Sequence, residues 1–377
     1  MKKYFIWFLV ALVVTGACKK KAKTTQDDDR QETTDKNRNA DAALMGITTP
    51  DLGVEGQAMP VRGKIQNFKS DTIRSLEIKW QADNGEEYAA VFDGLEIPSM
   101  GVFEFEHPTP YVPVRGRHTL SVWISDVNGN GPDSRPENDR RSKELLIGSN
   151  SVEHKVLYEE FTSSTCSPCY VFNTQYFNES FLNQIEGKYN LIKYQMNWPG
   201  AGDPYYTPEG GTRRIYYGVT GVPTLFIDGD EGTFFDRIAL RNDFNKHYAV
   251  PGLIDLQAFF DVDSVTKQVR VEVHGTPYIS GHFRMHIAVV EKETRQNATT
   301  NGETRFFNVM MKMVPDASGI DVNLTDGESF VETQEASLEG THIEEYGDLA
   351  VIVFIQDHDT RRVFQSVSAE YNPALIP

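Results

Sequence analysis

The chain has 377 residues, of which 39% are hydrophobic, and its formal net charge is −17. This length corresponds to two or three domains. The acidic balance excludes a nucleic-acid partner, because the chain offers no basic patch that could neutralise phosphates.

Residues 1–18 are predicted to be a lipoprotein signal peptide. Lys2 and Lys3 precede the apolar run Tyr4–Val14, which is too short to span a bilayer, and three small residues then lead to Cys18. This order resembles the lipobox of bacterial lipoproteins. The resemblance implies cleavage before Cys18, lipidation of its thiol and attachment to the outer membrane. The alternative is an ordinary signal peptide or an uncleaved anchor.

Residues 19–46 are predicted to be a disordered polar tether, because they contain too few apolar side chains to form a core. Such a tether would hold the folded part away from a membrane. Apart from Cys18, the chain has two cysteines, Cys166 and Cys169. Since exported proteins enter an oxidising compartment, this pair is expected to form a disulfide or to cycle through one.

Residues 47–149 are predicted to form a β-sandwich of the immunoglobulin type. Short runs rich in β-branched and aromatic residues alternate with Asn/Gly/Asp turn signals, without helical spacing. The expected strands are Met59–Phe68, Ile73–Ala82, Ala89–Ile97, Val102–His107, His118–Ser125 and Lys143–Ile147. The pattern resembles the adhesion-type sandwich modules of bacterial surface proteins.

One loop of this segment has the spacing of a calcium-binding loop. Its oxygen-bearing residues are Asp126, Asn128, Asn130 and Glu137, with Gly131 at the position of the sharp turn. The loop follows a strand instead of a helix and contains two prolines. A polar hairpin loop without a metal is therefore the favoured interpretation.

Residues 150–251 are predicted to form an α/β domain. A strand at Val156–Phe161 precedes a segment with helical spacing at Cys169–Ile185, and a second strand follows at Leu191–Met196. A short helix is expected at Thr212–Tyr217 and a strand after Pro223. Alternating strands and helices are typical of an α/β layer fold.

Residues 252–377 are predicted to form a second β-sandwich, because strands return without helices. The expected strands are Leu256–Phe260, Gln268–His274, His282–Val290, Arg305–Val314, Ser329–Leu338, Leu349–Gln356 and Val363–Ser368.

The C-x-x-C motif at Cys166 and Cys169 carries the candidate chemistry. A thiolate at a helix N-terminus is stabilised by the helix dipole and by free backbone N–H groups, so Cys166 is the predicted nucleophile. Cys169 lies one turn later and is the predicted resolving thiol. Two alternatives stay open: a static disulfide, or half of a metal site whose other ligands are missing.

A strand before the C-x-x-C, a helix at it and Val222-Pro223-Thr224 before a later strand together resemble a thioredoxin-fold domain. The resemblance implies that the Val222–Pro223 bond is cis and that this loop receives the substrate chain. It also implies that Glu160 is a buried acid that helps to deprotonate Cys169. The alternative is that Glu160 and its neighbour Glu159 are solvated at the end of the strand.

Further motifs are Glu159–Thr162 before the C-x-x-C, the loop Pro199–Pro204, and the runs Val351–Asp357 and Val363–Ser366. With these, the chain from residue 152 to the C-terminus resembles the thioredoxin-like outer-membrane lipoproteins of the 28-kilodalton outer-membrane protein type. The expected fold class is an α/β thioredoxin-like domain flanked by two immunoglobulin-like sandwiches. The expected function is thiol–disulfide exchange with exported cysteine-containing proteins or a redox partner protein, without a cofactor. The alternative is a surface adhesin or binding lipoprotein in which the Cys166–Cys169 disulfide is structural.

Overall fold

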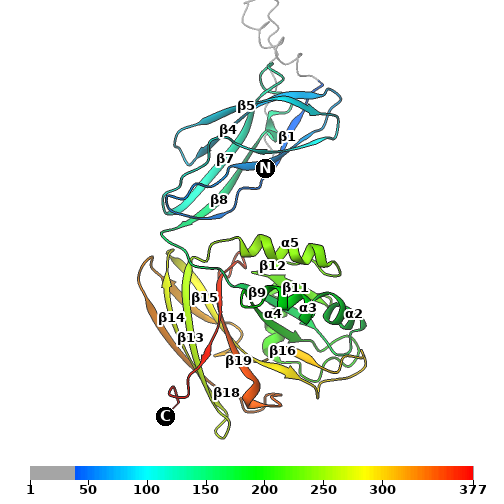
Figure 1. The fold of residues 1–377 in the computed structure, drawn as a ribbon, viewed down its shortest axis with the longest axis vertical. Helices are drawn as coiled ribbons and strands as arrows, with labels where there is room; N and C mark the ends of the chain where they lie inside the picture. The colour runs from blue at the N-terminus through cyan, green and yellow to red at the C-terminus, as the bar shows by residue number, and fades with distance from the viewer. Residues whose placement is uncertain (1–38, 377) are drawn as a thin grey trace, which may run out of the picture.

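The computed structural model describes residues 39–376. Strands make up 46% of the structure and helices 13%. An N-terminal β part lies at one end, and the α-helices of residues 39–376 all belong to the larger second part (Figure 1). The signal peptide, Cys18 and most of the predicted tether lie outside the described residues.

The N-terminal part consists of two packed sheets. One has the order β1-β3-β6 and the other the order β2-β8-β7-β4-β5. The strands are β1 (Ala42–Ile47), β2 (Leu52–Val54), β3 (Arg62–Asn67), β4 (Ile73–Ala82), β5 (Tyr88–Ile97), β6 (Val102–Glu106), β7 (Gly116–Val127) and β8 (Arg140–Gly148). Leu44 and Ile65 from the first sheet and Trp80 and Val122 from the second share one apolar core. The alternation of buried and exposed residues along β3 and β4 produces this core.

A single nine-stranded sheet runs through the second part, in the order β12-β11-β9-β10-β16-β15-β19-β20, with β17 paired to β15. Its strands are β9 (Val156–Thr162), β10 (Tyr189–Gln195), β11 (Thr224–Ile227), β12 (Asp230–Glu231), β15 (Gly281–Thr294), β16 (Phe306–Val314), β17 (Ile320–Leu324), β19 (Leu349–Gln356) and β20 (Val363–Ser368). The link between the two halves of the sheet is the parallel pairing of β10 with β16.

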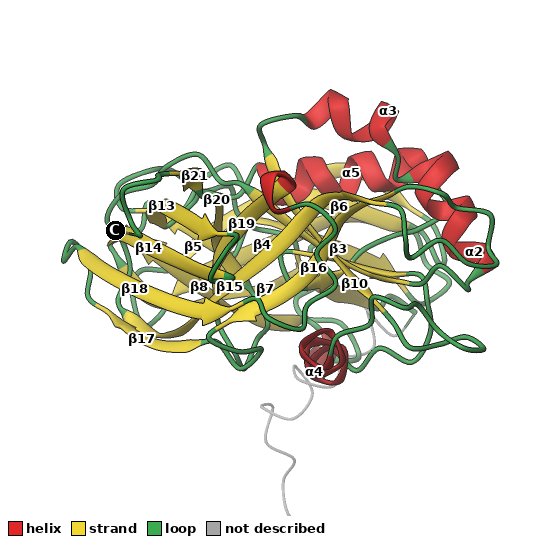
Figure 2. Cartoon of the chain, turned by 90° about the horizontal axis from the view of Figure 1, so that it is seen from below, coloured by secondary structure: helices red, strands yellow, loops and turns green. Residues whose placement is uncertain are grey.

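The two faces of this sheet are covered differently (Figure 2). Helix α4 (Pro208–Tyr217) packs on one face, where Phe161 and Ile192 share a core with Ala288 and Phe354. On the opposite face, α2 (Ser167–Val171), α3 (Glu179–Leu182) and α5 (Arg237–Tyr248) lie near the β9–β12 half. The β15–β20 half of that face packs against a four-stranded sheet of β18 (Phe330–Ser337), β14 (Gln268–Pro277), β13 (Ile254–Asp263) and β21 (Glu370–Tyr371).

The predicted fold class, an α/β thioredoxin-like domain between two immunoglobulin-like sandwiches, was wrong. The chain is mainly β, with 13% helix. Strands from residues 150–251 do not close into a sheet of their own, because β10 hydrogen-bonds to β16 from the C-terminal segment. Because the free edge of β10 pairs with β16, the sheet continues into strands of the C-terminal segment.

The helix expected at Cys169–Ile185 is divided into short pieces. Helix α2 continues into a π-helical turn, η2 (Phe172–Tyr176), and the chain then leaves helical geometry at Phe177. Asn178 starts α3 by accepting a hydrogen bond from the backbone N–H of Phe181, and a 3₁₀ turn, η3 (Asn183–Ile185), follows. The apolar spacing still places Phe172, Phe181 and Ile185 in one core.

Strand β9 contains two consecutive buried glutamates, and each needs a cation. Glu159 faces α4 and forms an ion pair with Arg213, with 2.7 Å between Arg213 Nη2 and Glu159 Oε1. The Tyr194 hydroxyl donates a hydrogen bond to Glu159 Oε1 at 2.7 Å. The Tyr217 hydroxyl donates to the other oxygen, Oε2. Arg213 is 2% exposed and Glu159 is 1% exposed, so water cannot replace either partner.

We expect Arg213→Met to lower the free energy of unfolding by about 3–5 kcal/mol, because it leaves the Glu159 charge buried without its cation. Urea denaturation would measure the change. The control is Arg74→Ala, which breaks the exposed Arg74–Glu96 pair and should change stability by less than about 1 kcal/mol. Equal effects of the two substitutions would contradict a structural role for the buried pair.

Candidate functional site

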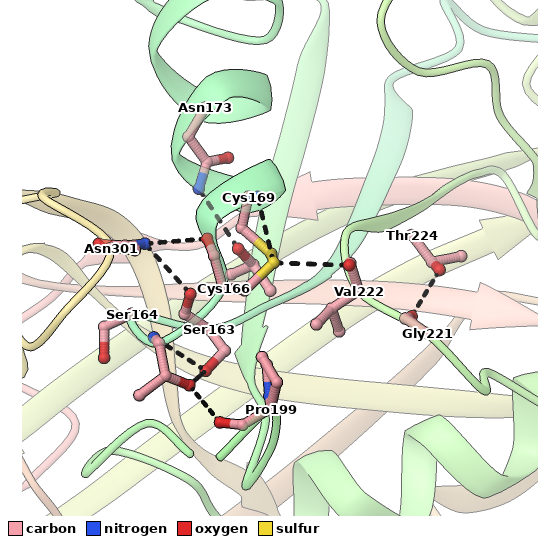
Figure 3. The surroundings of a disulfide bond; sticks show 12 residues. Ser163, Ser164, Cys166, Cys169, Asn173, Pro199, Gly221, Val222, Thr224 and Asn301 are labelled. Atoms are coloured by element: carbon pink, nitrogen blue, oxygen red, sulfur yellow. Dashed lines mark hydrogen bonds between the residues drawn. A yellow bond between two sulfur atoms is a disulfide. The ribbon is translucent and has the colours of Figure 1, made fainter. Parts of the chain in front are cut away.

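Cys166 and Cys169 form a disulfide at the junction between β9 and α2, as the sequence predicted (Figure 3). Cys166 is the N-cap of α2, and its Sγ accepts a hydrogen bond from the backbone N–H of Cys169 at 3.1 Å. A turn closed by the Cys166 N–H and the Ser163 carbonyl at 3.1 Å leads into the helix. Both cysteines are buried: Cys166 is 2% exposed and Cys169 is 0% exposed.

The loop before β11 lies against the disulfide. The Val222–Pro223 peptide bond is cis, and the Val222 carbonyl oxygen is 3.5 Å from Cys166 Sγ (Figure 3). Cys166 and Val222 are therefore direct neighbours, although they are 56 positions apart in the chain. The substrate-binding role of Val222 and Pro223 stays a prediction.

Glu160 is buried on the sheet face that carries α2, the η2 turn and α5. Its side chain is 0% exposed and lies 2.8 Å from Lys193 Nζ on the neighbouring strand β10. Within residues 39–376, no further hydrogen-bond donor reaches the two Glu160 oxygens. The alternative that Glu159 and Glu160 are solvated was wrong, since both are buried.

A polar network that the sequence did not predict continues from this ion pair. Lys193 Nζ donates to Asn173 Oδ1 at 2.9 Å, and Asn173 Nδ2 donates to the two Glu303 oxygens at 3.2 and 3.4 Å. Asn301 Nδ2 reaches Glu303 Oε2 at 3.3 Å and the Cys166 carbonyl at 3.4 Å. Asn301 and Glu303 lie more than 100 positions after the cysteines, in a polar loop without any motif. No sequence signal pointed to them.

Glu303 is buried at 8% exposure. Burial raises the pKa of Glu303 from 4.5 to about 7; Lys193 opposes this shift and the negative charge of Glu160 adds to it. The carboxyl group of Glu303 therefore changes its charge near neutral pH, beside the ion pair on β9 and β10.

A raised pKa means that the folded protein keeps this proton to a higher pH than the unfolded chain. Stability contributed by protonated Glu303 is therefore lost as the pH rises from about 4.5 to 7. When the pH is raised from 5 to 8, the free energy of unfolding of Glu303→Gln should increase relative to that of wild type by on the order of 1–3 kcal/mol. Urea denaturation at both pH values would measure this difference.

Glu179→Gln is the matched control, because Glu179 lines the same cavity but is exposed. Substitution of an exposed side chain usually changes stability by at most about 0.5 kcal/mol, so Glu179→Gln should stay close to wild type at both pH 5 and pH 8. A pH-independent difference for Glu303→Gln as well would contradict the raised pKa.

The oxygens of the calcium-loop candidate are engaged by nearby backbone. Asp126 accepts hydrogen bonds from the N–H groups of Gly129 and Gly131, at 2.6 and 2.5 Å. Asn128 Oδ1 accepts from the backbone of β4 at Arg74, at 2.7 Å. Asn130 donates to the Asn128 carbonyl, and Glu137 accepts from Arg135. These bonds are those of a polar hairpin loop.

In the part of the chain that the structure describes, no three His, Cys, Asp or Glu side chains converge in a way that could hold a metal ion. The same part contains no helix that is long and apolar enough to cross a membrane.

The sequence matches no known protein family and no curated protein. Among solved structures, a domain of the outer membrane lipoprotein Omp28 from Porphyromonas gingivalis is 14% identical, with a TM-score of 0.23; the match covers 32% of this chain and 89% of that one. The CARDB domain of the PF1109 protein from Pyrococcus furiosus, solved with di-metal ions, is 8% identical, with a TM-score of 0.24. That match covers 29% of this chain and 94% of that one. Similarity at this level is partial and assigns neither a family nor a function.

Proposed function

We propose that this protein is an envelope-anchored thiol–disulfide oxidoreductase that acts on exported cysteine-containing proteins through Cys166 and Cys169. The observation that carries the proposal is the buried Glu160–Lys193 pair on the sheet face that bears α2. Two buried charges cost free energy of desolvation, and a static disulfide does not require them. A buried carboxylate whose oxygens lack hydrogen-bond donors needs an explanation, and a role as a catalytic base is one.

The reduced protein would act in two exchange steps. The Cys166 thiolate attacks a substrate disulfide, which forms a mixed disulfide and releases one substrate thiolate. Cys169 then loses its proton to Glu160 and attacks Cys166 Sγ, which releases the second substrate thiolate and closes the Cys166–Cys169 disulfide. Two electrons pass from the cysteine pair to the substrate. The reverse sequence oxidises a substrate dithiol, and relative reduction potentials set the direction.

Two local contacts support Cys166 as the attacking sulfur. Its Sγ already accepts the Cys169 N–H, and this hydrogen bond would stabilise a thiolate in the reduced protein. The Val222 carbonyl lies on the other side of the sulfur, next to a cis-proline whose side chain is buried. An extended substrate chain placed along Val222 and Pro223 would present its sulfur to Cys166.

Cys169→Ser should trap a mixed disulfide between Cys166 and an exported protein, because the resolving thiol is gone. Cys166→Ser is the matched control and should trap none. Non-reducing electrophoresis of envelope extracts, followed by mass spectrometry of the reduced bands, would identify the substrates. Equal trapping by both variants would contradict the assigned roles.

The burial of both cysteines favours a second candidate, an adhesin or binding lipoprotein with a structural disulfide. A structural disulfide has a reduction potential below about −300 mV. An oxidoreductase should have a higher potential, and its reduced Cys166 should react with iodoacetamide near pH 6. Measuring both quantities on the purified protein separates the two candidates.

The envelope attachment is proposed to be a lipid on Cys18, after removal of residues 1–17. The full chain should then partition into the detergent phase of Triton X-114 and incorporate labelled palmitate. Cys18→Ala should do neither, whereas Cys166→Ala should do both. Palmitate incorporation by Cys18→Ala would show that another site is modified.

A further inference from the structure

The segment between β15 and β16 is held against the start of α2. Asn301 Nδ2 donates to the carbonyls of Ser163 and Cys166, at 3.2 and 3.4 Å, and the Asn301 N–H donates to the Ser164 carbonyl at 3.0 Å (Figure 3). Thr299 Oγ1 adds a hydrogen bond to Ser164 Oγ at 2.9 Å. A distant part of the chain thus fixes the backbone from which Cys166 projects.

Glu303 connects this segment to the Glu160–Lys193 ion pair. Its carboxylate accepts from Asn301 Nδ2 and Asn173 Nδ2. Asn173 accepts from Lys193, so its amide group must point its NH₂ toward Glu303 and its oxygen toward the ammonium. Glu303 therefore fixes the orientation of Asn173, whose amide oxygen competes with Glu160 for the Lys193 ammonium.

Two charged groups act on Glu303, Lys193 on β10 and Glu160 on β9. Two more line the same cavity, Arg305 just before β16 and Glu179 on α3. Lys193, Glu303, Arg305 and Glu179 line a surface cavity of about 490 Å³. Arg305 is held by Glu293, with 2.5 Å between Nη2 and Oε2, and Lys193 is held by Glu160 and Asn173. Lys193 contacts Glu160 directly and is linked to Glu303 through Asn173, so both carboxyl groups depend on this one cation.

We propose that Glu303 is a positioning residue for the Cys166–Cys169 pair, which acts through Asn173 and Lys193 on Glu160 and through Asn301 on the Cys166 backbone. The inference rests on the proposed thiol–disulfide exchange. A negative charge at Glu303 draws on the same ammonium that lies against Glu160, so it weakens the hold of Lys193 on the Glu160 carboxylate. The carboxylate is then more available to the Cys169 thiol.

The titration of Glu303 near neutral pH supports this coupling. When Glu303 is protonated, Lys193 pairs with Glu160 alone and holds its carboxylate more tightly. The rate at which Cys169 resolves a mixed disulfide should therefore rise between pH 6 and pH 8, in addition to the rise caused by the thiol itself.

The test uses the full chain and a small dithiol, dithiothreitol, as the reaction partner. The rates of reduction and of reoxidation by a small disulfide are measured from pH 5 to pH 9 for wild type, Glu303→Gln, Glu303→Asp and Glu179→Gln. Glu303→Gln should lose the inflection near neutral pH and should resolve mixed disulfides more slowly than wild type above it, because a neutral amide does not draw on the Lys193 ammonium. Glu303→Asp should keep the inflection, and Glu179→Gln should behave as wild type.

The possible failures differ from one another. If wild type exchanges but Glu303→Gln has the same pH profile, Glu303 has no positioning role, and the proposed function stands. If wild type is not reduced by dithiothreitol in the folded state, the proposed function fails and this inference fails with it. If Glu303→Gln does not fold, loss of the inflection in Glu303→Asp, which retains the charge, would overturn the inference.

Discussion

Two neighbouring buried carboxylates on β9 impose the strongest constraint on the second part of the chain. Because consecutive residues of a strand point to opposite faces of its sheet, Glu159 and Glu160 each need compensation on a different side. Arg213 on α4 supplies it on one face, and Lys193 on β10 supplies it on the other. Removing either cation would leave a buried charge, so α4 and β10 are tied to β9 by electrostatics as well as by packing.

The continuous nine-stranded sheet determines which residues reach the disulfide. The segment just before β16 lies against the turn where β9 leads into α2, because Asn301 hydrogen-bonds to the Ser163, Ser164 and Cys166 carbonyls. Asn301 and Glu303 thereby contact Cys166 and Asn173. In a chain whose central segment formed a separate domain, this loop would have no fixed position relative to the cysteines. The correction of the fold class and the additional site residues therefore have the same cause.

The environment of the disulfide combines features of both functional candidates. Burial of Cys166 and Cys169 is expected for a structural crosslink. A buried ion pair, a second buried carboxyl group and a carbonyl beside Cys166 Sγ are more than a crosslink requires. Since buried polar groups cost free energy unless they are compensated, a network of them that reaches the Cys166 backbone through Asn301 favours a chemical role.

The sequence by itself determined most strand positions and the place of the candidate chemistry. Ile73–Ala82, Leu349–Gln356 and Val363–Ser368 are strands with the predicted bounds, because β-branched runs between turn residues are a local signal. The same local signals predicted the C-x-x-C between a strand and a helix. Because consecutive strand residues alternate, they also put Glu159 and Glu160 on opposite faces of the strand. Helix α5 escaped prediction because its buried apolar side chains are only Leu240 and Phe244, which is too few for a helical pattern.

The tertiary structure alone decided how the strands are joined and which side chains surround the disulfide. Periodicity shows which face of a strand is buried, but it does not show which strand lies next to it. The β10–β16 pairing and the contacts of Lys193, Asn301 and Glu303 therefore had no signature in the sequence. Such residues are recognisable only by burial and by their partners, and those of Asn301 and Glu303 include residues more than 100 positions away in the chain.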